Sequence, residues 1–480
     1  MTFAAVVGSG PNGLAAAIRL ARAGVAVTVF EAAERAGGGA TSSVMAPSGV
    51  VRDHGSAAHP SAIASPFFST LDLARHGLRW RWADIDLAHP LDDGSVAVAT
   101  RDLDATAASL GEDAARWCRL FGPLARHADE LVDDVFRPVL HVPRHLAGFA
   151  RFGLAALLPA TAVARRFAGE RATALFVGAA AHKFGRLSTP LSSGPGLLLL
   201  ALAHVVGWPV AEGGSEAITR ALVAELTEAG GGVRTATTIR SLPQLNELMG
   251  VVPDIVMFDT APAGALAIIG DRLPARMRRR LRRYRHGPAA YKLDLVVDGG
   301  IPWVNAECAR AGTLHLGGSG REIAAAEAAT VRGRMPERPF VLVGQQYVAD
   351  PGRACGSLKP VYAYAHVPSG YGGDVSEAIL DQIERFAPGA RDRVVDRVAT
   401  PPGELARHNA NWVGGDIATG ANTSWQLVAR PRLSANPYSL GVPGMFVCSA
   451  ATPPGGGVHG MCGANAADAA LDQLVGRRSG

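Results

Sequence analysis

Short apolar runs alternate with segments of helical periodicity at the start of the chain. Residues 3–7 and 25–30 are apolar runs of strand length, and the residues between them place apolar side chains three and four positions apart. A strand, a helix and a second strand in this order are typical of a βαβ unit with parallel strands. The pattern therefore predicts an α/β fold that begins at the amino terminus.

In the central part of the chain, the pattern of apolar and polar residues changes twice. Residues 76–205 are strongly helical in pattern, with apolar residues at helical spacing over residues 103–110, 113–121 and 124–135. After about residue 290 the pattern indicates strands at residues 291–297, 340–347 and 360–366, followed by a helix at residues 376–386. We expect these segments to form a mixed sheet with helices beside it.

Further α/β segments lie between and after these regions. Ser215 is predicted to cap a helix, residues 233–242 read as strands, and residues 251–259 close that segment. Near the carboxyl end, residues 445–450 read as a buried strand that leads into a glycine-rich loop and a helix of small residues. The last residues of the chain are thus predicted to belong to the same α/β domain as the amino-terminal βαβ unit.

The loop after the first predicted strand is rich in glycine. Its sequence is Gly8-Ser9-Gly10-Pro11-Asn12-Gly13, and Glu31 closes the second predicted strand. Glycines let the backbone approach a pyrophosphate, the next helix supplies free N–H groups, and a carboxylate accepts hydrogen bonds from ribose hydroxyls. The pattern predicts a dinucleotide site whose contacts are Gly8, Gly10, Pro11, Asn12, Gly13 and Glu31.

Two more segments favour FAD over NAD as the dinucleotide. Residues 35–42 extend the glycine-rich region beyond the second strand, where NAD-type dehydrogenases have no matching element, and residues 53–56 follow a hairpin-like stretch. The loop at residues 453–460 offers a second helix amino terminus, whose N–H groups would stabilise charge on a reduced flavin. The further FAD contacts predicted are Arg35, Gly38, Thr41, Ser56, Ile239, Ala450, Gly457, Val458 and His459.

Over essentially its whole length the chain resembles the phytoene-desaturase-related branch of the FAD-dependent amine-oxidase-like superfamily. Besides the glycine loops, the resemblance rests on Gly207-Trp208-Pro209, the segment 312–318, Tyr364 to Pro368, and Gly414-Gly415-Asp416. It implies a Rossmann-type FAD-binding domain interleaved with a mixed-sheet plus helical substrate domain. The FAD-binding domain is predicted to comprise residues 1–75, 206–282 and 436–480, and the substrate domain residues 76–205 and 283–435. No cysteine or histidine tether is recognisable, so we expect FAD to be non-covalent.

Lys292 is the first candidate for a chemical role. In the amine-oxidase branch of the superfamily a lysine in such a strand reaches a water beside flavin N5, and the resemblance places Lys292 there. Strand alternation also puts Lys292 and Asp294 on one face, so a simple surface ion pair is the competing interpretation.

Tyr362, Tyr364 and His366 share one face of a predicted strand, with alanines on the other face. Such a face can line a pocket, where His366, with an ordinary pKa near ~6.5, would take a proton while the flavin takes hydride. Structural hydrogen bonds made by the same side chains are the alternative. Lys292, Tyr364 and His366 are therefore the predicted catalytic residues, and no metal site is predicted.

The composition and charge of the chain limit the other classes of protein to which it could belong. A chain of 480 residues exceeds one core, so two domains are expected. A net charge of only +5, with scattered arginines, argues against a nucleic-acid partner. Five cysteines without a C-x-x-C pair indicate neither a disulfide framework nor a metal site. The first strand leaves no room for a secretory signal, so a cytoplasmic location is expected.

The predicted function is that of an FAD-dependent dehydrogenase or desaturase, which transfers hydride from a lipophilic or secondary-metabolite substrate to flavin N5. Oxygen or a quinone-like acceptor is expected to reoxidise the flavin. Apolar stretches at residues 149–158 and 197–206, with the small basic excess, suggest a peripheral membrane contact. An amine or amino-acid oxidase of the same fold, and a flavoprotein with a scaffolding role, stay open as alternatives.

Overall fold

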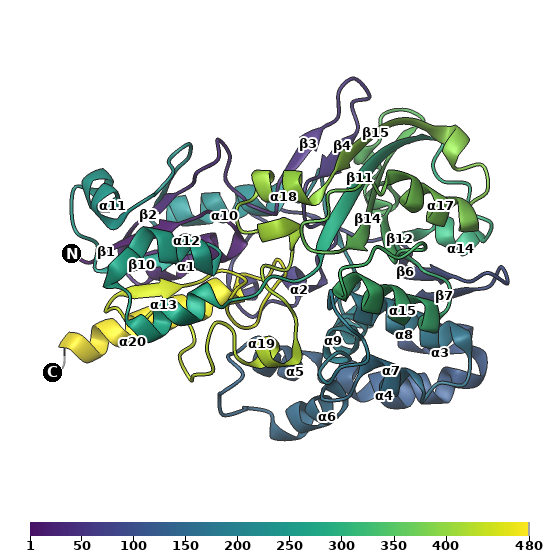
Figure 1. Cartoon of the computed structure of the whole chain (residues 1–480), viewed down its shortest axis with the longest axis horizontal. Helices are drawn as coiled ribbons and strands as arrows, with labels where there is room; N and C mark the ends of the chain where they lie inside the picture. Colours follow the sequence, from purple (N-terminus) through teal and green to yellow (C-terminus); the bar gives the residue numbers. More distant parts are fainter. Residues whose placement is uncertain (479–480) are drawn as a thin grey trace.

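A computed structural model describes residues 1–478 of the chain. Figure 1 shows two sheets side by side, with a group of helices below the second one. The first sheet, sheet A, has five parallel strands in the order β16-β10-β1-β2-β9. These strands are β1 (Phe3–Val7), β2 (Ala26–Phe30), β9 (Gly232–Arg234), β10 (Ile255–Phe258) and β16 (Met445–Val447). The predicted βαβ unit with parallel strands is confirmed.

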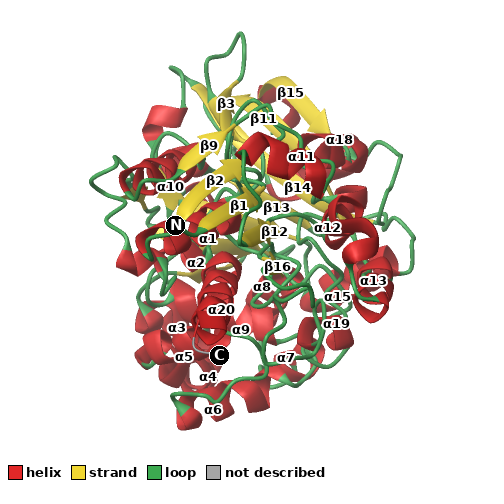
Figure 2. Cartoon of the chain, turned by 90° about the vertical axis from the view of Figure 1, so that its left-hand side faces the viewer, coloured by secondary structure: helices red, strands yellow, loops and turns green. Residues whose placement is uncertain are grey.

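Helices cover both faces of sheet A (Figure 2). One side carries α1 (Pro11–Arg22), α10 (Glu216–Glu228) and α20 (Met461–Arg478), and the other α11 (Leu242–Met249), α12 (Pro262–Ile269) and α13 (Ala275–Arg282). Because successive strand residues point to opposite faces, Ala4 and Val6 of β1 join the first core and Ala5 and Val7 the second. A sheet buried on both faces explains why these strands are almost continuously apolar.

The second sheet, sheet D, has seven strands in the order β15-β11-β14-β13-β12-β6-β7. Its neighbours are antiparallel except for β12 and β6, so the sheet is mixed as predicted. The strands are β6 (Ile85–Pro90), β7 (Val96–Ala99), β11 (Ala289–Asp298), β12 (Ala311–Leu316), β13 (Val341–Gly344), β14 (Leu358–Val367) and β15 (Val394–Thr400). Each sheet draws its strands from the segments predicted for one domain, while the domain boundaries themselves stay a prediction.

Helices from residues 103–203 form a layer beside sheet D (Figure 1). They are α3 (Leu103–Ser109), α4 (Ala114–Arg126), α5 (Ala128–Val135), α6 (Leu146–Ala156), α7 (Ala160–Ala164), α8 (Glu170–Ala181) and α9 (Gly194–Ala203). Trp117 and Phe121 of α4 are fully buried in this layer, which α15 (Gly320–Val331) joins through Ile323. The other face of sheet D packs on α17 (Ser376–Phe386). Within residues 1–478 no helix combines the length and the apolar character needed to cross a membrane.

A short hairpin ties the two sheets together. Its strands are β3 (Ser42–Val44) and β4 (Val51–Asp53), and the buried Asp53 carboxylate lies 2.5 Å from Arg353. Asp53 also accepts hydrogen bonds from the Ser42 hydroxyl and the Ser215 N–H. The remaining short elements are α2 (Pro60–Ile63), β5 (Trp80–Arg81), β8 (Val210–Ala211), α14 (Ala306–Ala309), α16 (Gln346–Ala349), α18 (Pro402–His408) and α19 (Ser424–Val428).

Three local predictions differ from the structure. Ser215 precedes α10 but makes no side-chain cap, because its hydroxyl donates to the Ser56 carbonyl instead. Of residues 233–242, predicted as strands, only 233 and 234 are extended in sheet A, as the end of β9; after them, the Ala236 and Thr237 N–H groups bond to the loop that follows β2. The strand predicted at residues 340–347 ends at Gly344, and α16 follows.

Candidate functional site

The glycine turn between β1 and α1 is closely packed against Asp259, the residue after β10. An added Cβ at Gly8, where φ is +101°, would lie 2.6 Å from the Asp259 carbonyl oxygen. A Cβ at Gly13 would lie 2.3 Å from the Gly8 carbonyl oxygen. Side chains at these positions are therefore excluded, and the backbone stays open for a ligand on the opposite side.

Glu31 follows β2 and faces the same turn. Its carboxylate accepts the Ser9 N–H at 2.9 Å, the Ser9 hydroxyl at 2.6 Å and the Ala33 N–H at 2.9 Å. These contacts fix the carboxylate at the edge of the glycine turn, where a ribose hydroxyl would bind in a dinucleotide-binding fold. The position agrees with the role predicted for Glu31.

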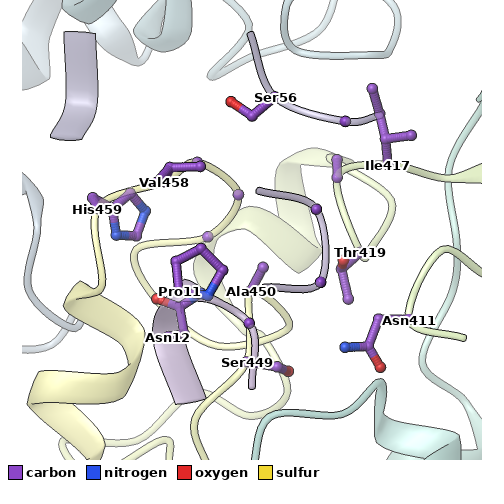
Figure 3. A pocket seen from close by; sticks show the side chains of 18 of the residues that line it. Pro11, Asn12, Ser56, Asn411, Ile417, Thr419, Ser449, Ala450, Val458 and His459 are labelled. Carbon is purple, nitrogen blue, oxygen red and sulfur yellow. The ribbon is translucent and has the colours of Figure 1, made fainter. Parts of the chain in front are cut away.

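A single large cavity of about 1750 Å³ begins at the glycine turn. The residues predicted to contact FAD line it with one exception; they are Gly8, Gly10, Pro11, Asn12, Glu31, Arg35, Gly38, Thr41, Ser56, Ile239, Ala450, Gly457, Val458 and His459. Figure 3 shows Pro11, Asn12, Ala450 and Val458 grouped around this end of the cavity. Gly13 is the exception, because its N–H donates to Asp259 and its Cα packs inside the turn.

Two buried polar atoms at this end fit a bound dinucleotide. Asn12 Oδ1 and Thr260 Oγ1 are buried, and neither has a hydrogen-bond partner among residues 1–478. Both residues line the cavity. Buried polar groups in folded proteins almost always find a partner, so a polar ligand at this end would complete the hydrogen bonding. The glycine cradle, Glu31 and these two atoms together fit FAD.

The carboxyl-terminal loop lies against the same end of the cavity and leads into α20. Figure 3 shows His459 and Val458 beside Pro11 and Asn12. Burial lowers the pKa of His459 to about 4, so its ring is neutral, and its Nδ1 accepts the Met461 N–H at 3.0 Å. His459 therefore organises the start of α20, whose amino terminus points to the cavity region predicted for the flavin.

Arg35 lines the cavity but is directed partly away from it. Its guanidinium pairs with Glu216 on α10 and donates weakly to the Ser42 carbonyl at 3.4 Å. More than half of the side chain is exposed. Contact with a phosphate would require Arg35 to leave Glu216, so the backbone of the glycine turn is the stronger candidate for that role.

Lys292 lines the cavity from β11 and is buried. Its ammonium pairs with the buried Asp294 carboxylate and lies 4.5 Å from the centre of the Tyr362 ring. Arg52 reaches the same carboxylate at 3.2 Å. The predicted pair with Asp294 exists, but its interpretation as a surface pair is wrong because both groups are buried. Burial lowers the pKa of Lys292, and Asp294 opposes that shift.

Tyr362, Tyr364 and His366 lie on one face of β14 as predicted, yet only the tyrosines reach the cavity. The His366 Nδ1 lies 2.6 Å from the Glu327 carboxylate, and the Phe184 ring covers the imidazole with ring centres 3.8 Å apart. His366 is not among the lining residues. Direct contact between His366 and a substrate is therefore not supported, because Phe184 and Tyr364 lie in between.

The chain is similar to several known proteins in sequence and in structure. The family description "NAD(P)-binding Rossmann-like domain" matches residues 6–72. The rat protein "pyridine nucleotide-disulfide oxidoreductase domain-containing protein 2" is 24% identical, with 97% of this chain and 92% of the relative covered. Putrescine oxidase bound to putrescine has a TM-score of 0.63 at 17% identity, covering 99% of each chain. An oxidoreductase from Methanosarcina mazei has a TM-score of 0.60 at 16% identity, covering 98% of this chain and 100% of its own.

The chain has the same fold as these solved oxidoreductases. The resemblance predicted from the glycine loops is confirmed at the level of the fold, since the alignments with both solved structures extend over nearly the whole chain. Because the chain returns to sheet A through β16 and α20, one cavity is lined by residues as far apart in sequence as Gly8 and His459.

Several residues at the nucleotide end were not predicted. Asn411 joins two loops, because its Oδ1 accepts the Ala261 N–H at 2.7 Å and its Nδ2 donates to the Asp259 carbonyl at 3.0 Å. Trp412 packs on the glycine extension; an added Cβ at Gly39 or Gly55 would lie 2.8 Å from its ring. The only signal in the sequence was the group of polar residues His408, Asn409 and Asn411 shortly before the glycine pair Gly414-Gly415.

Proposed function

We propose that this protein is an FAD-dependent oxidoreductase that oxidises a lipophilic substrate. The observation that carries the proposal is one cavity of about 1750 Å³ that joins the glycine turn to an apolar compartment among helices. Ligand sites usually occupy about 300–1000 Å³. The cavity therefore has room for a dinucleotide and for a second molecule at its other end.

The second compartment is lined mainly by apolar side chains from α5, α6 and α9. They are Val135, Phe136, Phe149, Phe152, Leu157, Leu198 and Leu199. Opposite them, Lys292, Tyr362, Tyr364 and Leu342 of sheet D form the other wall. A substrate held there would gain from burial of apolar surface, about 25 cal/mol per Å². This lining supports a substrate with an extended apolar portion.

FAD, when bound, supplies the redox chemistry by accepting hydride at N5 of its ring. The residues of this chain position the reactants. The apolar wall excludes water from the substrate, and the buried Lys292 ammonium presents a fixed positive charge and N–H donors to the cavity. We propose that Lys292 faces the flavin ring, as the resemblance implies, and that it orients a water or the oxygen acceptor.

The charges of the lining argue against a cationic substrate. Four carboxylates line the cavity, and Glu31, Glu34 and Asp259 belong to its nucleotide end. The fourth, Asp134, is already hydrogen-bonded to the N–H groups of Arg144 and His145 and to His141. No further carboxylate of residues 1–478 lines the second compartment to receive an ammonium group. A neutral or weakly anionic substrate is the better match.

An amine oxidase remains the second candidate because putrescine oxidase has the same fold. The Tyr362 and Tyr364 rings stand at 89° with centres 5.9 Å apart, and aromatic faces can receive a cation. The Lys292 ammonium already occupies the Tyr362 face, however, at 4.5 Å from the ring centre. An amine substrate would have to compete with this buried charge.

An anaerobic screen distinguishes the candidates. Purified holoprotein would be mixed without oxygen with polyenes and long-chain alcohols in detergent micelles, and separately with putrescine and benzylamine. We expect bleaching of the flavin absorbance band by a member of the lipophilic set. Bleaching by the amines alone, with release of ammonia and peroxide after oxygen is admitted, would establish the amine oxidase. A flavin that no donor reduces would favour the scaffolding role.

Two substitutions on α6 supply a matched control for the same screen. Phe149 lines the cavity, whereas Leu154, five residues further along α6, is exposed and lies outside the lining. Phe149→Asp should raise the KM for a lipophilic substrate at least tenfold, because a charge would enter the apolar wall. Leu154→Asp should leave turnover in micelles unchanged. Equal effects of both substitutions would show that the substrate binds elsewhere.

A further inference from the structure

Asp259 brings a buried carboxyl group into the dinucleotide end of the cavity. It follows β10, is 5% exposed, and lines the cavity together with Gly8, Gly10 and Pro11. Its Oδ2 accepts the Gly13 N–H at 3.0 Å. Gly13 lies in the first turn of α1, so this carboxyl group satisfies one of the free N–H donors at the amino terminus of that helix.

This arrangement places two carboxyl groups, those of Asp259 and Glu31, at the site where the negatively charged diphosphate of FAD would bind. The diphosphate of FAD carries two negative charges, and Glu31 already contributes a carboxylate at the same turn. Among residues 1–476, no lysine or arginine shifts the pKa of Asp259, so none offsets a charge there. A second carboxylate facing a diphosphate in a buried cradle would be strongly unfavourable.

We propose that Asp259 binds the diphosphate of FAD as a neutral carboxylic acid, with its proton on Oδ1, and that uptake of this proton couples FAD retention to pH. Oδ2 is occupied as the acceptor of the Gly13 N–H, so Oδ1 is the oxygen left to carry a proton. A protonated carboxyl donates one hydrogen bond and adds no charge. The inference rests on the proposed FAD site.

The groups around Asp259 agree with a neutral carboxyl. Burial and the nearby Glu31 raise the pKa of Asp259 to about 7, and this outweighs the opposing effect of hydrogen bonds from the Gly13 and Gly10 N–H groups. The other titratable groups that interact with it are Cys448 after β16 and Cys462 on α20. Burial raises the pKa of both thiols, that of Cys462 to about 12, so neither changes its charge between pH 6 and 9. A bound diphosphate would disfavour the carboxylate further.

The test is the pH dependence of FAD affinity. Apoprotein would be titrated with FAD between pH 6 and 9 in the presence of EDTA, with quenching of flavin fluorescence as the readout. We expect the wild-type Kd to rise roughly tenfold per pH unit above about pH 7, because one proton must be taken up for each FAD bound. Asp259→Asn, which is neutral at every pH and similar in shape, should bind FAD with a nearly constant Kd.

Glu31→Gln is the matched control, since it removes the neighbouring carboxylate and leaves Asp259 in place. It should bind FAD with a different Kd but keep the rise with pH. A direct measurement needs no variant: wild-type apoprotein mixed with FAD at pH 8 in weak buffer should take up close to one proton per FAD, read with an indicator dye.

Two results would overturn the inference: a wild-type Kd that does not change with pH, or an Asp259→Asn variant that keeps the wild-type slope. Absence of FAD binding by every form at every pH would instead contradict the FAD assignment itself. The two failures are therefore distinguishable.

Discussion

The Lys292 ammonium lies over the Tyr362 ring, 4.5 Å from its centre, and both residues line the cavity from the adjacent antiparallel strands β11 and β14. The ammonium also pairs with Asp294, two residues along the same strand. This contact fixes a buried positive charge in the wall of the cavity. It gives Lys292 a defined position that a flexible surface lysine would lack.

Replacement of Lys292 by methionine tests whether this charge faces the flavin. We expect Lys292→Met to slow flavin reduction or reoxidation at unchanged FAD content, because the loss would be in the chemical step. Reoxidation can be measured without a substrate, by photoreducing the holoprotein and mixing it with oxygen in a stopped-flow instrument. Wild-type rates in both half-reactions would contradict the proposed role.

The same substitution should also lower stability. Removal of one partner from a buried ion pair costs roughly 3–5 kcal/mol, and Arg52 at 3.2 Å would reduce that loss for Asp294. The double variant Lys292→Met with Asp294→Asn removes both charges and should recover part of the stability. Urea unfolding of the two variants separates this structural effect from the kinetic one.

Gly10→Val should abolish FAD binding. A Cβ at Gly10 would lie 2.6 Å from the Asp259 carboxylate, and the rest of the side chain would enter the space where the backbone approaches the diphosphate. Gly403→Ala on α18 is the control, because a Cβ there meets no atom within 4 Å. FAD content after gel filtration is the readout. Normal FAD content in Gly10→Val would rule out the glycine turn as the diphosphate site.

Acid should destabilise the protein below about pH 6.5. Burial lowers the pKa of His89 and of His459 to about 4, so the unfolded chain binds protons that the folded chain excludes. The stability they contribute is complete above pH 6.5 and is lost as the pH falls toward 4. Each should lower the free energy of unfolding by about 2 kcal/mol at pH 5. Urea unfolding at pH 7 and 5 measures this, and His89→Gln should reduce the difference.

Exposed apolar side chains surround the cavity wall formed by α6. They are Val139, Leu140, Val142, Leu146 and Leu157, with Arg144 and Arg151 among them. We propose that this surface contacts a membrane and admits substrate. The protein should float with vesicles that contain phosphatidylserine, and Leu146→Glu should reduce flotation. Val395→Glu, at an exposed position on β15, should not. Wild-type protein that stays with the soluble fraction would contradict the membrane contact.

The dinucleotide end could be predicted because its determinants are local. Gly8 to Glu31 form one βαβ unit, in which strand, turn and helix follow from neighbours in sequence. The C-terminal loop was recognisable for the same reason. Asp259 gave no such signal, since its contact with Gly13 joins residues 246 positions apart and depends on β10 pairing with β1.

The candidate chemical residues were predicted less well, because strand alternation gives the face of a residue and not what covers it. Lys292 and Asp294 share a face as expected, but packing of the hairpin residue Arg52 against them decides that the pair is buried. His366 shares the face of Tyr364, yet Phe184 and Phe340 from distant segments cover it. Such coverage depends on tertiary contacts that periodicity does not contain.

The flavin content of the purified protein tests the central claim most directly. Protein released from the native fold by heat should yield FAD close to one per chain, identified by its absorbance and by the rise in fluorescence after phosphodiesterase cleavage. This result is expected because the glycine turn, Glu31 and the C-terminal loop together line one end of a single cavity. A colourless protein that takes up no added FAD and binds NADH instead would contradict the account.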